Sequence, residues 1–112
     1  MEINGKKVGL YYSIGADCDL EDEMEKVACP TWPAFLERLG TVQAYMKVAV
    51  ILNKWYCLVY GGEKISEKDI LSLPAGAMND LFSSVDKAME EGKKNNIKAK
   101  PVKGKNAESA DE

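Results

Sequence analysis

The side chains that most often carry out catalysis are scarce in this sequence of 112 residues. There is no histidine, which removes the commonest general base and the commonest metal ligand. The three cysteines, Cys18, Cys29 and Cys57, are odd in number and widely spaced, so they predict neither a disulfide framework nor a zinc site. No glycine-rich phosphate loop follows a strand. We therefore expect a protein that is not an enzyme, with no catalytic residue, no metal and no cofactor.

An acidic run from Asp17 to Glu25 is the next pattern with possible chemistry. A calcium loop would need glycine where Asp22 stands and glutamate where Ala28 stands, so that interpretation fails. The apolar residues in and after the run share one face of a helix: Leu20, Met24, Val27 and Ala28. The run therefore predicts the solvated face of a helix.

Aromatic and methionine side chains remain as candidates for binding. Trp and Tyr are enriched at protein interfaces, and methionine suits an adaptable apolar surface as well as a core. At helical spacing the aromatic residues fit a core, a stacking site for a ligand, or anchors for another chain. The candidate partner-binding residues are Trp55, Tyr56, Val59, Tyr60, Met78 and Phe82.

Composition and charge favour one globular domain with an acidic body. Hydrophobic residues make up 46% and charged residues 29%, which is ordinary for such a domain. Residues 1–91 hold nine Lys/Arg against fifteen Asp/Glu, a balance of −6, and residues 92–112 hold six Lys against three acids, a balance of +3. An acidic body binds duplex nucleic acid poorly, so only the basic end could give weak, salt-sensitive binding.

The N-terminal segment predicts a β-hairpin over residues 1–15. Asn4-Gly5 is a strong two-residue turn signal, and Val8 to Ile14 alternate in polarity until Gly15. The hairpin has open edges, so strand pairing between subunits is a route to a homo-oligomer. The first fifteen residues lack a continuous apolar run, so no secretion signal is predicted.

Five helices are expected after the hairpin, at about 18–29, 33–39, 42–60, 67–73 and 77–91. The helix at 42–60 approaches the roughly 20 residues of a membrane span, but Lys47 and Lys54 within it argue against one. A helix that is apolar nearly all round is normally buried, so it should lie at the centre of a bundle. The fold class is α+β, mainly α: a single domain at 1–92 with an N-terminal β-hairpin and about four to five helices, followed by a disordered, Lys-rich tail at 93–112.

This order of elements resembles the tail assembly chaperones of long-tailed (siphovirus-like) bacteriophages and prophages, especially those of Gram-positive hosts. The resemblance covers roughly residues 1–92 and is carried by four segments: Met1–Leu10, Val59–Gly62, Ile65–Leu71 and Ala88–Gly92. It implies a protein of the host cytoplasm that binds the tape measure protein, keeps it soluble and leaves before the virion is complete. The tail tube protein is a second partner that the resemblance suggests. The family offers no motif residues that transfer as a site.

Two other classes of function stay open. One is a structural tail or head-tail connector protein, which would persist in the virion. The other is a small regulatory protein that acts through its basic tail.

Overall fold

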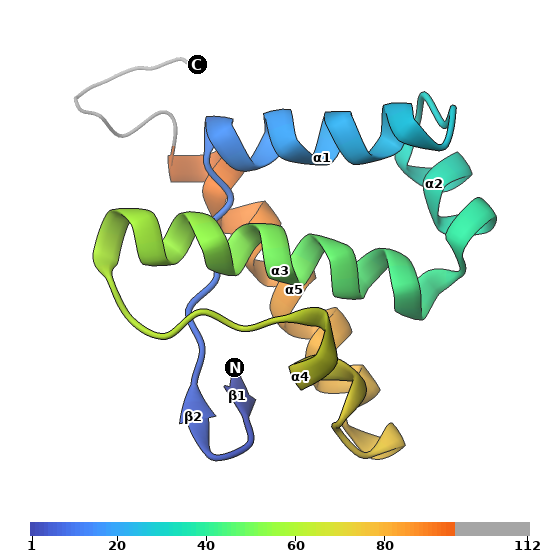
Figure 1. Ribbon diagram of the computed structural model, residues 1–112. Helices are drawn as coiled ribbons and strands as arrows, with labels where there is room; N and C mark the ends of the chain where they lie inside the picture. Colours follow the sequence, from blue (N-terminus) through green and yellow to red (C-terminus); the bar gives the residue numbers. More distant parts are fainter. Residues whose placement is uncertain (96–112) are drawn as a thin grey trace.

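The computed structural model describes residues 1–95, in which a small hairpin precedes a helical bundle (Figure 1). Strands β1 (Glu2–Ile3) and β2 (Lys6–Lys7) pair antiparallel, with Glu2 opposite Lys7. Asn4 and Gly5 between them have φ angles of 53° and 81°. Both angles lie in the left-handed region that Asn-Gly turns tolerate, so the predicted hairpin turn is confirmed.

The helices are α1 (Ile14–Lys26), α2 (Trp32–Leu39), α3 (Thr41–Tyr60), α4 (Glu67–Leu71) and α5 (Met78–Asn95), with a 3₁₀ turn η1 (Ala75–Ala77) before α5. The predicted fold class, mainly α with an N-terminal hairpin and up to five helices, is confirmed. The predicted tail begins too early, because residues 93–95 belong to α5. The rest of the predicted tail lies outside the described residues.

The prediction that the second strand runs to Ile14 is wrong. Beyond Val8 the backbone leaves the hairpin, and the Tyr11 N–H donates to the Leu52 carbonyl of α3 at 3.1 Å. The Ser13 hydroxyl then accepts from the Ala16 N–H at 3.0 Å and caps α1. The chain therefore enters a helix at Ile14, which is 81% exposed rather than facing a core.

Local caps explain the remaining helix boundaries. Helix α1 ends at Lys26, three residues before the predicted end, and Ala28 beyond it has a φ of 56°. Thr31 caps α2 by accepting from the Ala34 N–H. Ser66 and Asp69 form a capping box at the start of α4, which ends at Leu71 rather than at 73.

Helix α3 lies at the centre, as predicted, and α1, α2, α4 and α5 each pack against it (Figure 1). Its inward face buries six residues: Ala44, Met46, Val48, Ala49, Leu52 and Asn53. Phe35 of α2 and Leu81 and Val85 of α5 are buried in the same core. Within residues 1–95, no helix combines the length and the apolar character needed to cross a membrane.

Candidate partner-binding surfaces

The structure divides the six predicted partner-binding residues into two groups. Trp55, Tyr56, Val59 and Tyr60 lie in the last turns of α3. Met78 and Phe82 lie on α5 and face the first half of α3. A helix of 20 residues is about 30 Å long, so the two groups form separate surfaces rather than one.

Trp55 holds α1 against α3. Its indole N–H donates to the Asp19 carboxylate at 2.7 Å, and Lys54 Nζ donates to the same oxygen at 2.8 Å. The pKa of the Asp19 carboxyl lies below its ordinary value because Lys54 and Trp55 both donate hydrogen bonds to it. The indole ring covers Gly15 so closely that a Cβ there would collide with it. Trp55 is therefore a packing residue between two helices.

Tyr56 has a similar role toward the N-terminal segment. Its ring lies over Gly9, where a Cβ would collide with it. The ring also lies 5.0 Å from that of Tyr60, centroid to centroid. The close contacts with Gly15 and Gly9 thus show that Trp55 and Tyr56 are packed inward. The spacing of residues along α3 does not contain this information, because the two glycines are far away in the sequence.

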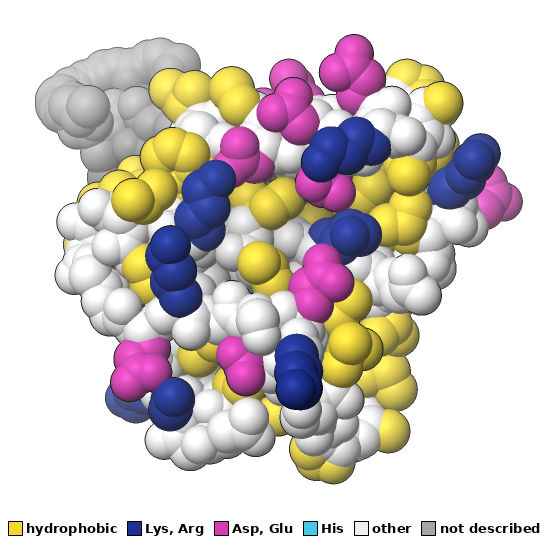
Figure 2. All heavy atoms as spheres, viewed as in Figure 1, with side chains coloured by type: hydrophobic (Ala, Val, Ile, Leu, Met, Phe, Trp, Pro, Cys, Tyr) yellow, Lys and Arg dark blue, Asp and Glu magenta, His cyan; other side chains and the backbone are white. Residues whose placement is uncertain are grey.

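The exposed part of this end is the last turn of α3. Leu58, Val59 and Tyr60 are 60%, 53% and 62% exposed, and we call these three residues the α3-end surface. The Tyr60 ring also meets Tyr11 edge-on at a centroid distance of 5.5 Å. Figure 2 shows hydrophobic side chains gathered where α1 begins and α3 ends. Leu58 was missed by the sequence prediction although it belongs to the same apolar run.

Met78 lines an apolar groove of about 210 Å³ at the other end of α3. Val42 and Leu71 share this groove and are 40% and 67% exposed, and Met78 is 37% exposed. The Phe82 ring packs at 4.7 Å from that of Tyr45, centroid to centroid, and is only half-buried. Met78 is therefore accessible to a partner, whereas Phe82 belongs mainly to the packing between α3 and α5.

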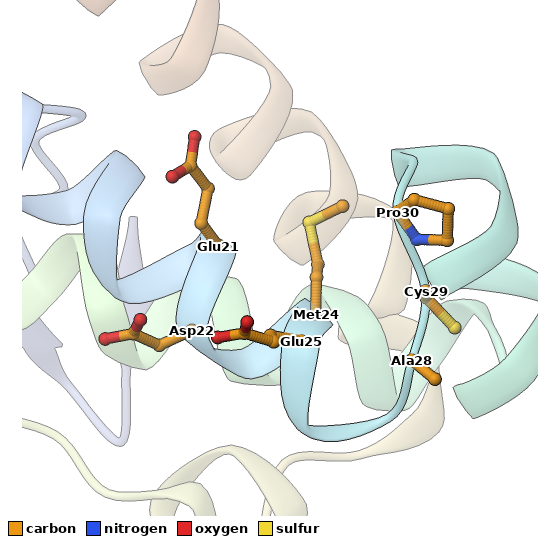
Figure 3. Close-up of a pocket in the computed structure, with 7 residues that line it drawn as sticks. All are labelled: Glu21, Asp22, Met24, Glu25, Ala28, Cys29 and Pro30. Carbon is orange, nitrogen blue, oxygen red and sulfur yellow. The ribbon is translucent and has the colours of Figure 1, made fainter.

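A third hollow lies between the second half of α1 and the loop that leads to α2, and it is drawn in Figure 3. It has a volume of about 560 Å³ and is lined by Glu21, Asp22, Met24, Glu25, Ala28, Cys29 and Pro30. Its carboxylates do not converge, since Glu21 points away from Asp22 and Glu25 (Figure 3). The Cys29 thiol is buried and donates to the Val27 carbonyl at 3.4 Å. In the described part of the chain, no three His, Cys, Asp or Glu side chains are grouped to hold a metal ion.

Comparisons with known proteins leave the family open. No protein-family model, no curated protein and no solved structure matches this chain. The resemblance to tail assembly chaperones therefore stays a prediction from the sequence.

Proposed function

We propose that this chain is a tail assembly chaperone of a long-tailed bacteriophage or prophage. It binds the tape measure protein in the cytoplasm of the bacterial host and keeps it soluble while the tail assembles. The observation that carries the proposal is the α3-end surface, where three consecutive large apolar side chains stand in solvent. Contiguous exposed apolar surface on a small domain marks a site for another chain.

The size of this surface sets the kind of binding. Burying one such side chain completely contributes about 1.5–3 kcal/mol, and each is 53–62% exposed, so the three together supply about 3–5 kcal/mol. A micromolar complex needs about 8 kcal/mol, and association has its own cost. The client must therefore also touch neighbouring side chains such as the ring of Tyr11, which lies against Tyr60. Binding of this strength is reversible, and it lowers the concentration of free client that can aggregate.

Co-expression with the tape measure protein encoded near this chain tests the function. We expect the client to be soluble, and to co-purify, only when this chain is present. An insoluble client in both cases would contradict the chaperone function. Mass spectrometry of purified particles provides a second test, because a chaperone should be missing from them and a structural tail or connector protein should be present.

The surface is tested by two matched pairs of substitutions. Leu58→Ser with Val59→Ser changes the α3-end surface, and Leu71→Ser with Met78→Ser changes exposed apolar residues at the other end of α3. We expect the first pair to reduce the soluble client roughly tenfold, as the loss of interface anchors does, and the second pair to reduce it less than twofold. If only the Leu71/Met78 pair reduced the soluble client, the client would bind the Met78 groove instead of the α3-end surface.

A further inference from the structure

A fourth hollow is a groove of about 950 Å³ between α1 and α5. Both helices pack on α3, and the end of α5 meets the segment just before α1, where a Cβ on Gly92 would collide with the Tyr12 carbonyl. From this junction the two helices diverge (Figure 1). The groove therefore exists because α3 holds two helices that separate along their length.

The floor of the groove is apolar. Leu20 and Met24 contribute from α1, Met89 from α5 and Trp32 from α2. Leu20 is buried, and the other three are half-buried against the core. The two methionines are flexible, polarizable side chains that adapt to the shape of a bound apolar group.

The rims of the groove are acidic. Asp17 and Glu21 line it from α1, and Asp86 and Glu90 line it from α5. Each pair is four residues apart, so two negative charges lie side by side on one helix face and repel each other. Tyr12 donates a hydrogen bond to Asp17, and Tyr45 donates one to Asp86 at 2.7 Å. These hydroxyl groups orient the carboxylates without neutralising them.

The rim carboxylates have no cationic partner within residues 1–95. Elsewhere in this part of the chain, lysines do pair with acids: Lys54 with Asp19, Lys47 with Glu23 and Glu67, Lys26 with Glu23, and Lys6 with Glu63. Figure 2 shows such opposite charges interspersed on the face in front of α3. Lys87 and Lys93 line the groove but form no ion pair with the rims. The groove lining thus carries four carboxylates and two lysines, a net charge of −2, around an apolar floor.

We propose that this groove binds a positively charged amphipathic α-helix of a partner protein. Apart from Tyr12 and Pro30, its lining residues lie on helices, and neither β1 nor β2 lines it, so a partner cannot dock there by adding a strand. Helix α1 has 13 residues and is about 20 Å long, which matches the apolar face of a helix of three to four turns. Such a helix would lay its apolar side chains on the floor and place Lys or Arg between the two rims. The inference does not depend on the proposed chaperone function.

Fluorescence anisotropy with the full chain tests the proposal. The probe is a labelled peptide of about 18 residues, five helical turns, with Leu on one face and Lys along both edges of that face. A scrambled peptide of the same composition is the control, because an acidic protein attracts any cation weakly. We expect the amphipathic peptide to bind at least tenfold more tightly than the scrambled one. Equal affinity of the two peptides would overturn the proposal.

Charge reversal at the rims locates the site. Glu21→Lys with Glu90→Lys changes one carboxylate on each rim, and Glu37→Lys with Glu91→Lys makes the same change in net charge at exposed positions outside the groove. We expect the rim pair to weaken binding roughly tenfold and the control pair less than twofold, with unchanged helix content by circular dichroism. Equal weakening by both pairs would assign the binding to net charge alone and overturn the proposal.

Further measurements distinguish a partner helix from two other possible occupants of the groove. If a second copy of this chain filled the groove, sedimentation velocity would show an oligomer that the rim pair dissociates. If the chain's own lysines filled it, replacing Lys98, Lys100, Lys103 and Lys105 with Gln would tighten peptide binding about tenfold. Either result would overturn a partner helix as the occupant. We expect neither.

Discussion

Asn53 is a polar side chain buried in the centre of α3, 1% exposed. Its amide nitrogen donates to the Gly9 carbonyl at 3.1 Å and to the Glu63 carbonyl at 3.4 Å. Its amide oxygen accepts from the Ile65 N–H at 2.9 Å. One side chain therefore supplies backbone partners to the N-terminal segment and to the loop before α4, neither of which has regular secondary structure at these points. A buried backbone group without a partner is costly, which explains an amide in an otherwise apolar core.

Replacing Asn53 by Ala should destabilise the protein by about 2–3 kcal/mol, because the carbonyl of Gly9 and the N–H of Ile65 lose their partner inside the core. Urea denaturation followed by circular dichroism measures the change. Gln43→Ala on the exposed face of the same helix is the control and should alter stability by less than about 0.5 kcal/mol. A loss below 0.5 kcal/mol for Asn53→Ala would mean that water replaces the amide.

The residues of the candidate surfaces were predictable by type but not by exposure. One apolar stretch contains Trp55, Tyr56, Val59 and Tyr60. Spacing alone does not show which of them are buried and which are exposed. The structure separates them through contacts with Gly9 and Gly15, which are more than 35 residues away in the sequence. Asp17 and Glu21 were likewise assigned only to a solvated helix face, because a groove needs α5 placed opposite α1.

At the scale of elements, the helices were predictable because their signals are local. Thr31 and Ser66 act as the caps that their positions suggest, and the apolar stripe of α5 packs on α3. The start of α1 was not predictable, since alternation from Val8 to Ile14 favours a strand. Tertiary contacts override that local preference: the Tyr11 N–H bonds to α3 rather than to a strand.

The junction between α5 and the N-terminal segment makes a sharp prediction. In the interior of a helix, Gly→Ala normally stabilises by about 1 kcal/mol. At Gly92 the new Cβ would meet the backbone carbonyl of Tyr12, which cannot rotate away, so Gly92→Ala should instead destabilise by about 1–3 kcal/mol. Thermal denaturation measures it. Gly76→Ala is the control, because its Cβ would enter open space and should change stability by less than about 0.5 kcal/mol. A stabilised Gly92→Ala variant would show that α5 does not approach Tyr12 so closely.

At the scale of the whole molecule, two tyrosine–aspartate hydrogen bonds connect parts of the chain at the edges of the groove. Tyr12 joins the N-terminal segment to α1 through Asp17, and Tyr45 joins α3 to α5 through Asp86. Burial, and donation to the neighbouring carboxylate, raises the pKa of both tyrosines, that of Tyr45 to about 12. Loss of either proton would put a phenolate beside a carboxylate. The bundle should therefore lose stability at alkaline pH through both contacts.

The sign of this effect follows from the direction of the shift. The pKa of Tyr45 is higher in the folded state, about 12, than its ordinary value of 10.0, so the unfolded chain releases the proton first as the pH rises. The contribution of Tyr45 to stability is complete below pH 10 and is lost between pH 10 and about 12.

Tyr45→Phe should therefore lower the free energy of unfolding at pH 8 by about 0.5–1 kcal/mol, a modest value because the contact is partly open to solvent. Near pH 12 the variant and the wild type should become equally stable. Urea denaturation at both pH values measures the difference, and Tyr11→Phe, which keeps the aromatic contact with Tyr60, is the control. Equal stability of the variant and the wild type at pH 8 would mean that Tyr45 contributes through the packing of its ring on Phe82 rather than through its hydroxyl.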